Sequence, residues 1–333
     1  MKETNDIKKR YYFFLFWSLL TAVLLTISSY AWFSANRILG LRSFNIHIAS
    51  KGGILISVDG IEWKEVVTLS DIMRARLTYP RSINQIPSSI EPVSTSGRVD
   101  NGKLRLFYGL VDASANPNEN ILSATQAVEE EGFLENSDGK FIAFDIFLKN
   151  HYEKTLYLSP ESSIDYMTKN STGIENAFRV GFLHQGTLPI GSSASQIQSL
   201  TNSNRAIIWE PNYDVHTESA VQNAYNRHGI VTRTNNATRI EYDGIYREIP
   251  TSSNVFLSQA NRRNFPNYFE RVSVDIATRK NFVGLQEIIN LQPGISKLRL
   301  YIWIEGQDVD VEDNSRVGEI LIDIQMAVQQ RQQ

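Results

Sequence analysis

Residues 140–149, KFIAFDIFLK, carry the strongest strand signal of the chain and decide its fold class. Side chains alternate between the two faces of a strand, so this segment has one wholly apolar face. That face consists of Ile142, Phe144, Ile146 and Leu148. The opposite face is partly apolar as well and carries Phe141, Asp145 and Phe147. Apolar residues on both faces are typical of an inner strand of a β-sandwich.

Further alternating segments predict a mainly β chain around this strand. They are residues 44–48, 54–58, 103–111, 177–184, 272–277, 297–305 and 320–328. The pair Gly52-Gly53 between the first two segments predicts a β-hairpin. Residues 156–158 are expected to pair with residues 140–149, and the last segment is expected to pair beside an early strand.

Three short segments predict helices. Residues 68–77, TLSDIMRARL, have Ser70 as the candidate N-cap. Residues 121–131 are rich in Ala, Gln and Glu, which favour helix. Residues 218–227 follow Thr217, a candidate N-cap, and Gly229 is expected to end that helix.

Two stretches predict long surface connections. Residues 80–101 and 186–204 are rich in polar residues and turn formers and show few apolar positions. The second stretch belongs to a longer range, residues 186–270, that we interpret as an insertion of mixed structure. The sequence thus predicts one β-sandwich domain over residues 34–333 with this insertion.

An uncharged apolar run, YYFFLFWSLLTAVLLTISSYAWF, occupies residues 11–33. A helix of this length reaches about 35 Å, enough to cross the roughly 30 Å hydrocarbon core of a bilayer. Aromatic rings flank both ends, where they prefer the headgroup region. The residues expected to lie in the bilayer include Tyr11, Trp17, Leu24, Tyr30 and Trp32. The run therefore predicts a transmembrane signal-anchor helix.

Basic residues directly before this run set its predicted orientation. The positive-inside rule places residues 1–10 in the cytoplasm as a short tail. The body is then extracellular, and the chain is a single-pass membrane protein. The alternative is a signal peptide cut near Ala31, because small residues stand at the −3 and −1 positions of that bond. Cleavage there would give a secreted protein.

Composition limits the stabilising forces and the partners. The 333-residue chain has no cysteine and a net charge of −3. An exported protein without cysteine forms no disulfides, so its stability must come from core size, a ligand or assembly. A slightly acidic chain gives no electrostatic reason to expect nucleic acid as a partner.

The sequence contains none of the common catalytic motifs. There is no His-Glu-x-x-His, no Gly-x-Ser-x-Gly and no glycine-rich phosphate loop. The lack of cysteine excludes thiol catalysis and cysteine metal sites, and the five histidines show no ligand spacing. We therefore expect no catalytic residue, no cofactor-binding residue and no enzymatic activity.

Two acidic groups of residues could still hold a metal ion. Residues 305–314, EGQDVDVEDN, resemble an oxygen-rich loop that could bind Ca²⁺. The ligands would be Glu305, Asp308, Asp310 and Asp313. The alternative is a solvated turn whose charges discourage edge pairing. Glu210, Asp214 and His216 could form a mixed carboxylate and imidazole site, or they serve only the start of the following helix.

Several short stretches together resemble one family of exported proteins. They are residues 30–34 (YAWFS), 53–60 (GILISVDG), 144–150 (FDIFLKN), 208–212 (IWEPN) and 301–308 (YIWIEGQD). Spread over most of the chain, they are similar to stretches of the TasA/camelysin family of surface and biofilm-matrix proteins of Gram-positive bacteria. The resemblance implies a jelly-roll-like antiparallel β-sandwich that serves as a fibre subunit.

Three functional hypotheses remain. We favour a structural protein that builds a surface filament, matrix or envelope complex through strand pairing with copies of itself or with other envelope proteins. The second hypothesis is a monomeric cell-surface module that uses residues 80–101 and 186–204 to bind a glycan or a protein. The third is a hydrolase whose site includes Glu210 or His216.

Overall fold

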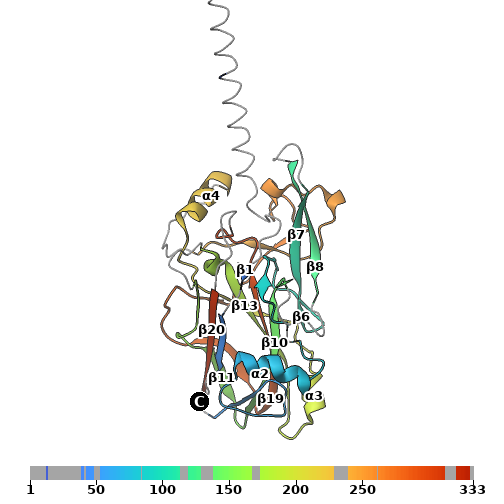
Figure 1. Ribbon diagram of the computed structural model, residues 1–333, viewed down its shortest axis with the longest axis vertical. Coiled ribbons are helices and arrows are strands. Elements are labelled where there is room, and N and C mark those ends of the chain that lie inside the picture. Colours follow the sequence, from blue (N-terminus) through green and yellow to red (C-terminus); the bar gives the residue numbers. More distant parts are fainter. Residues whose placement is uncertain are drawn as a thin grey trace, which may run out of the picture.

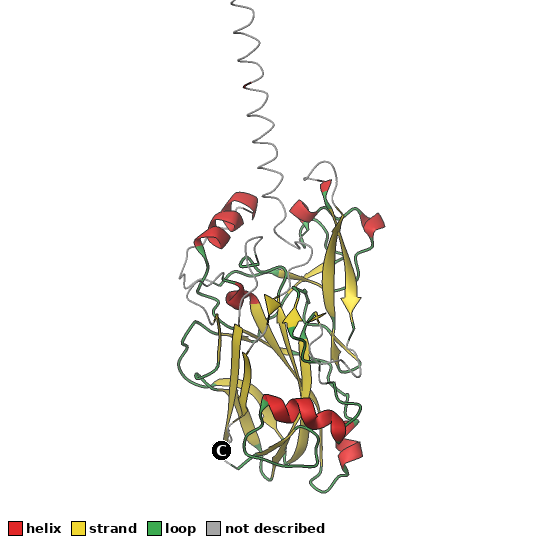
Figure 2. Cartoon of the chain, in the orientation of Figure 1, coloured by secondary structure: helices red, strands yellow, loops and turns green. Residues whose placement is uncertain are grey.

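The structure of the protein is a computed structural model. It describes residues 13, 39–40, 43–48, 53–83, 85–112, 119–128, 138–166, 173–228, 239–260, 262–311 and 320–330. Over these residues the chain is mainly β, which confirms the predicted class (Figures 1 and 2). Within the same ranges no helix combines the length and the apolar character that a membrane crossing requires.

The predicted membrane segment lies almost entirely outside the described residues. This applies to Tyr11, Trp17, Leu24, Tyr30 and Trp32, to the cytoplasmic tail and to the bond after Ala31. The anchor, its orientation and its cleavage therefore stay predictions.

The larger sheet has six strands in the order β17-β14-β13-β19-β10-β3. Their bounds are Leu55–Ser57 (β3), Ile142–Asn150 (β10), Phe178–Leu188 (β13), Ile207–Glu210 (β14), Ile276–Ala277 (β17) and Gly294–Ile304 (β19). β19 lies between β10 and β13 and is antiparallel to both. Since β10 has β19 on one side and β3 on the other, the prediction that it is an inner strand is confirmed.

The smaller sheet contains β12, β20, β11 and β18 in that order, with β2 also paired to β20. Their bounds are Ser43–Ile48 (β2), Lys154–Leu158 (β11), Ser163–Tyr166 (β12), Gln286–Leu291 (β18) and Ile320–Gln330 (β20). The last strand does pair beside an early one, because β2 runs parallel to β20.

Two pairing predictions are wrong. The segments 44–48 and 54–58 form no hairpin, because β2 joins β20 whereas β3 joins β10 in the other sheet. Residues 156–158 do not pair with β10 either, because β11 lies between β18 and β20. Alternation identifies a strand, but it contains no information about which strand is the neighbour.

The two sheets bury one hydrophobic cluster between them. The larger sheet contributes residues such as Phe144, Val180 and Leu300, and the smaller one contributes residues such as Ile322 and Ile324. These five side chains are at most 1% exposed. Removal of this apolar surface from water is the main favourable term in folding.

The outer side of the larger sheet is covered as well. Phe141 and Ala143 of the β10 region belong to a second cluster with Tyr301 and Trp303. The chain segment that lies over this side includes residues 80–101, so the prediction of a surface connection there is wrong. Its residues Ile90, Val93, Ser94 and Thr95 are fully buried. Backbone hydrogen bonds fix the segment in place, among them Val93 N to the carbonyl of Ile304 at 2.9 Å.

The predicted helix over residues 121–131 is wrong. Residues Ile121–Ala127 form β8, which pairs antiparallel with β7, Leu106–Asp112. Leu122 and Ala124 of β8 pack into a third apolar cluster. Tertiary pairing thus overrides the helical preference of Ala and Gln.

Short strands and helices make up the rest of the secondary structure in the described residues. The strands are β1 (Leu39–Gly40), β4 (Ser89–Ile90), β5 (Val99–Asp100), β6 (Lys103–Leu104), β9 (Asp138–Gly139), β15 (Asp243–Ile245) and β16 (Phe269–Arg271). The helices are α2 (Leu69–Arg74), α3 (Ala194–Gln198) and α4 (Glu218–His228), with 3-10 turns η1 (Ala75–Leu77), η3 (Ile174–Ala177), η4 (Thr251–Ser253) and η5 (Leu257–Gln259). Part of the range predicted as an insertion, β14, is a strand of the larger sheet.

Of the two predicted N-caps, the one at α4 is confirmed and the one at α2 is wrong. Thr217 does cap α4, because its hydroxyl accepts the backbone N–H of Ala220 at 3.1 Å. The cap of α2 is Thr68 and not Ser70: the Thr68 hydroxyl accepts the N–H of Asp71, and the Asp71 carboxylate accepts the N–H of Thr68. This reciprocal pair is a capping box. It holds α2 so that Ile72 reaches the central cluster.

Thr68 and Ser70 should differ in their contribution to the free energy of unfolding. Thr68→Ala removes one half of the capping box and should lower the free energy of unfolding by about 1 kcal/mol. Ser70→Ala, two residues away on the exposed surface, should change it by less than about 0.5 kcal/mol. Urea unfolding of both variants measures the difference. A larger loss for Ser70→Ala would contradict the assignment of Thr68 as the cap.

Candidate functional site

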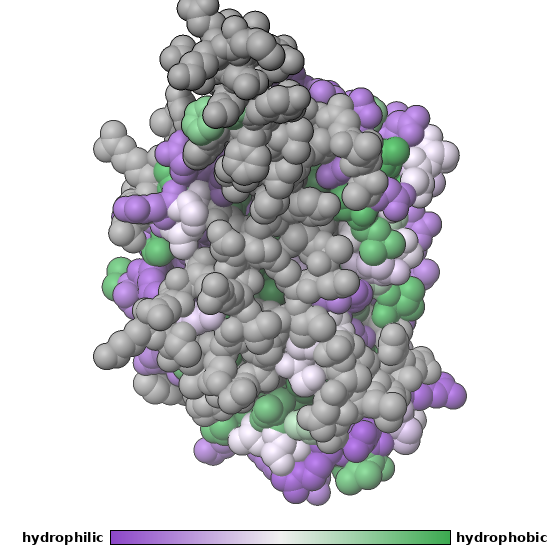
Figure 3. Space-filling view, turned by 45° about the horizontal axis from the view of Figure 1, so that its top comes forward, coloured by the Kyte–Doolittle hydropathy of each residue, from purple (hydrophilic) through white to green (hydrophobic). Residues whose placement is uncertain are grey.

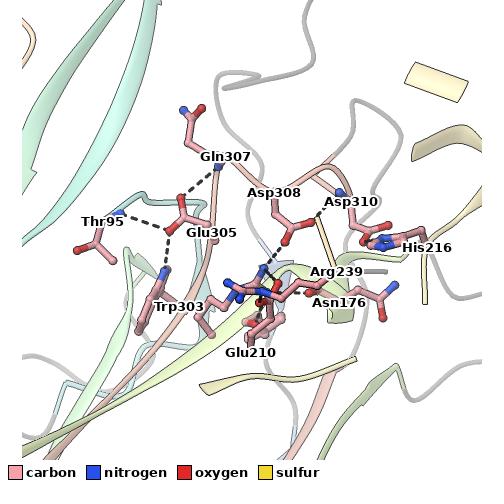
Figure 4. Close-up of polar contacts among 12 residues, drawn as sticks. Thr95, Asn176, Glu210, His216, Arg239, Trp303, Glu305, Gln307, Asp308 and Asp310 are labelled. Carbon is pink, nitrogen blue, oxygen red and sulfur yellow. Dashed lines mark hydrogen bonds and ion pairs between the residues drawn. The ribbon is translucent and has the colours of Figure 1, made fainter. Parts of the chain in front are cut away.

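A buried group of charged side chains lies where β13 begins, β14 ends and the chain leaves β19 (Figure 4). We call it the Arg179 cluster. It consists of Arg179, Glu210, His216, Arg239, Glu305, Asp308 and Asp310. Burial of so many charges requires partners for each of them, so their contacts define what the site can do.

Arg179 is fully buried and occupies the centre. Its Nη2 donates to Glu210 Oε1 at 2.8 Å and also to the carboxylate of Asp308. Its Nη1 donates to the backbone carbonyls of Asn176 and Phe178 at 2.9 and 2.8 Å. The guanidinium therefore joins η3 and the start of β13 to the end of β14 and to the loop after β19.

Glu210 accepts from a second guanidinium. Arg239 donates its Nε to Glu210 Oε2, so each carboxylate oxygen of Glu210 has its own arginine. The side chain of Arg239 is 26% exposed, whereas that of Glu210 is 4% exposed. Arg239 thus closes the cluster toward the surface.

Glu305 lies at the end of the cluster away from His216 (Figure 4) and is fully buried. Its Oε2 accepts from Trp303 Nε1 at 3.1 Å and from the backbone N of Thr95 at 3.3 Å. Its Oε1 accepts from the backbone N of Gln307 at 3.2 Å. Burial raises the pKa of Glu305 to about 7 although these hydrogen bonds favour the charged form.

Asp310 and His216 form a pair at the start of α4. His216 Nδ1 lies 2.8 Å from Asp310 Oδ2. Burial raises the pKa of the Asp310 carboxyl, and the neighbouring charge of Asp308 adds to this rise. Burial lowers the pKa of His216, but the hydrogen bond and the charge of Asp310 outweigh that effect and hold it above its ordinary value. The pair therefore retains a proton more readily in the folded chain than in the unfolded one.

The structure joins the two acidic groups that the sequence suggested as separate metal sites. Glu210 and His216 belong to the same cluster as Glu305, Asp308 and Asp310. The alternative interpretation as a solvated turn is wrong for the described residues 305–311, because Glu305 is 0% and Asp310 1% exposed. Asp214 does not join the cluster; its carboxylate accepts the backbone N–H of Lys280 at 2.9 Å.

Arginine side chains supply the positive charge that faces Glu210 and Asp308 in this cluster. Throughout the described ranges, no group of three or more His, Asp or Glu side chains is placed to hold a metal ion. Asp313 lies outside the described residues, so the Ca²⁺ site stays a prediction. The Asp308 carboxylate that was expected to bind Ca²⁺ meets the guanidinium of Arg179.

Arg179, the central residue of the cluster, was not among the residues predicted from the sequence. Arg179 stands in the alternating segment AFRVGFLH, directly between Phe178 and Val180. A charged residue inside an otherwise apolar strand is a usable signal, because such a residue needs a buried partner. Trp303, the donor to Glu305, is also the register partner of Arg179 on β19.

Comparisons with known proteins assign neither a family nor a function to the chain. No protein-family model, no curated protein and no solved structure matches the chain. What the cluster does must therefore be argued from its geometry. It ties β13, β14, the loop after β19 and the start of α4 together by ion pairs, and Glu305 and Asp310 bind protons near neutral pH.

Removal of the central cation should destabilise the fold strongly. Arg179→Met leaves Glu210 and Asp308 buried without it and should cost about 3–5 kcal/mol of unfolding free energy. Arg239→Met removes a partly exposed cation from the same carboxylate and should cost about 1 kcal/mol. Chemical denaturation of both variants tests this order. Equal losses would show that Arg179 is not the central tie.

The raised pKa of Glu305 predicts an unusual pH dependence. Its value of about 7 in the folded chain exceeds its ordinary value of 4.5, so the folded state binds this proton more tightly. Stability from this group is present at low pH and is lost as the pH rises through about 7. Between pH 4.5 and 8 the loss should be on the order of 3 kcal/mol.

Glu305→Gln should remove that part of the pH dependence, because glutamine does not ionise. The free energy of unfolding, measured in urea at each pH, should then decrease less for this variant than for the wild type. Glu287→Gln, at an exposed position of β18, is the control and should keep the wild-type slope. A wild-type slope in Glu305→Gln would contradict the prediction.

Proposed function

We propose that this chain is an exported structural subunit, held at the membrane by residues 11–33, that assembles with copies of itself by strand exchange. In this proposal the exchanged element is β2 and the acceptor is the edge of β20. The two facing sheets form a jelly-roll-like sandwich in which the parallel pairs β2–β20 and β14–β17 are departures from an antiparallel pattern. The proposal assigns no catalytic activity.

One observation carries the proposal: the pairing of β2 with β20. Six residue pairs run from Ser43↔Leu321 to Ile48↔Met326. β20 is the one partner that β2 has among the described strands, and β2 and β3 belong to different sheets. β2, which follows the two-residue strand β1, is thus hydrogen-bonded to one strand, and nearly the whole chain lies between the two paired segments.

Such a strand can be supplied by a second copy at little cost. If β2 of one subunit replaced β2 of the next, the backbone hydrogen bonds would be the same and the subunits would be joined. The acceptor edge cannot stay open, because β20 contributes Ile322, Ile324 and Met326 to the core. The edge therefore needs β2 of its own chain or of another copy, and in this proposal another copy supplies it in the assembled state.

The visible surface agrees with assembly through backbone pairing. On the face in Figure 3, the coloured hydrophobic residues form small areas separated by hydrophilic ones. Large exposed apolar side chains such as Leu110, Val128 and Val283 belong to separate segments of the chain. Isolated apolar residues of this kind are ordinary on a protein surface.

The position of β2 and the sequence resemblance support the same proposal. β2 begins at Ser43, shortly after the predicted anchor, so an exchanged strand would lie close to the membrane. The similar TasA/camelysin proteins build fibres outside the cell. Other envelope proteins could supply the same kind of strand, and cleavage near Ala31 would release the subunit into a matrix.

Engineered cysteines test strand exchange directly, because the chain has none of its own. Asn45 and Asp323 are register partners on β2 and β20. The variant with Asn45→Cys and Asp323→Cys, oxidised as assembled full-length protein in detergent, should give a ladder of multimers on a non-reducing denaturing gel. Disulfides within single chains alone, or a protein that forms no assemblies, would contradict the proposal.

A second pair serves as the control. Thr187 and Ser296 are register partners on β13 and β19, two strands inside the body. Cysteines at these two positions should link within one chain whether or not the protein is assembled. Each single cysteine variant should give dimers at most.

A further inference from the structure

The outer edge of β7 is paired with another segment only near its start. β7 and β8 form a sheet of two strands, at the upper right in Figure 1. On the side of β7 away from β8, the backbone N–H of Ser94 donates to the carbonyl of Phe107 at 2.8 Å, and the N–H of Phe107 donates to the carbonyl of Ser94 at 2.9 Å. Beyond Phe107, this side of β7 has no backbone partner among the described residues.

Strand geometry shows which groups point to this open side. Every second residue of a strand directs both its N–H and its C=O to the same side. Since Phe107 bonds to Ser94, Gly109 and Val111 also direct theirs away from β8. Neither residue has a backbone hydrogen bond there to any described segment. The open edge therefore offers two donors and two acceptors to a further strand.

This edge lacks the features that commonly protect a strand from pairing. Native edges are blunted by charged residues, proline or a bulge, or are covered by another segment. Residues 108–111, YGLV, contain neither charge nor proline, and the register with β8 runs without a shift. The outer edge of β8, by contrast, is covered, because Leu122 and Ala124 donate their N–H groups to the carbonyls of Val255 and Ile249. The hairpin thus has one open edge, on β7.

We infer that a second copy of the chain covers this edge, with its β7 antiparallel to the first about a two-fold axis at Leu110. Gly109 then faces Val111 of the second copy on each side of the axis, and the open donors meet open acceptors. Leu110, which is 50% exposed, faces its own counterpart, so the two side chains cover each other. Two hairpins become one sheet of four strands, which is more stable than a sheet of two.

The charges near the axis fit this arrangement. Tyr108 faces Asp112 of the second copy, and these residues share one face of the strand with Leu110. Lys140 Nζ lies 4.7 Å from the centre of the Tyr108 ring and also pairs with Glu91. The carboxylate of Asp112 would therefore approach a phenol hydroxyl and an ammonium group. The two copies of Asp112 lie at opposite ends of the paired segment, which keeps like charges apart.

Neighbouring registers are less favourable. A shift toward the start of β7 requires the edge at Phe107, which Ser94 already occupies. A shift in the other direction places Leu110 opposite Asp112 of the second copy, so that the exposed leucines no longer meet. Leu110 is therefore the centre that uses the open edge and also covers its apolar side chain.

This contact is separate from strand exchange. Exchange of β2 joins each subunit to the next, whereas a two-fold contact joins the same surface of two subunits and closes with the pair. With five residues from each strand it is smaller than a usual dimer interface, so we expect a weak dimer. In a filament it would link two neighbouring filaments side by side. That last role rests on the proposed function, but the two-fold contact does not.

A single cysteine tests the axis, because the chain has none of its own. Leu110→Cys would set two cysteines opposite each other at Cα atoms about 4.5 Å apart, a separation that a disulfide can span. The full-length variant, oxidised in detergent, should give one dimer band on a non-reducing denaturing gel. Thr125→Cys is the control, exposed on the same face of β8 but roughly 14 Å from its counterpart. It should give at most about a fifth of that dimer.

A mixture of two variants tests the register. Tyr108→Cys and Asp112→Cys, oxidised together, should give a mixed dimer, identified by the mass of its disulfide-linked peptides. Either variant alone should give no more dimer than Thr125→Cys. Equal dimer from Leu110→Cys and Thr125→Cys, or no mixed dimer, would overturn the two-fold contact. A multimer ladder from the β2 and β20 cysteines without a Leu110→Cys dimer would overturn this contact alone and leave strand exchange standing.

Discussion

The structure depends on one strand, β19, that is buried along its whole length. All eleven residues from Gly294 to Ile304 are buried, and the strand pairs with β10 on one side and β13 on the other. Its inward side chains build the cluster between the sheets. Its outward side chains are also out of water because residues 80–101 and the region of α3 cover them. Any charge on this strand must therefore be compensated within the protein.

This constraint explains where the charged residues of the neighbouring strands lie. Asp145 of β10 is the register partner of Arg299, so the carboxylate and the guanidinium meet on the outer side of the sheet. Glu305 follows the end of β19 and is enclosed by Trp303 and the backbone of Thr95. The alternating pattern placed Asp145 and Phe147 on the same face before any pairing was known. Which residue would neutralise Asp145 depended on the register, which the pattern does not contain.

The difference between a strand's own alternating pattern and its pairing register also separates what the sequence predicted from what it did not. Strands with strict alternation, such as residues 140–149 and 297–305, were predicted correctly because burial of a face requires that period. Residues 121–131 failed because local preference for helix was weaker than pairing with β7. Residues 80–101 failed because Ser94 and Thr95 are polar but buried, with partners on other segments. That the two acidic groups meet at Arg179 could not be predicted for the same reason, because the members come from distant parts of the chain.

The Arg179 cluster and the pair of Arg299 and Asp145 accommodate buried charge in different ways. In the Arg179 cluster, four carboxylates meet two arginines and one histidine. Excess acid can be relieved inside the fold because a carboxyl can take up a proton, as the raised pKa values of Glu305 and Asp310 indicate. Asp145 accepts from Arg299 at 2.7 and 3.1 Å and lies 3.2 Å from Lys297 Nζ, and arginine does not release its proton in proteins. Burial raises the pKa of Asp145, but Arg299 and Lys297 hold it below its ordinary value, so the pair of Arg299 and Asp145 keeps its charges where the Arg179 cluster takes up protons.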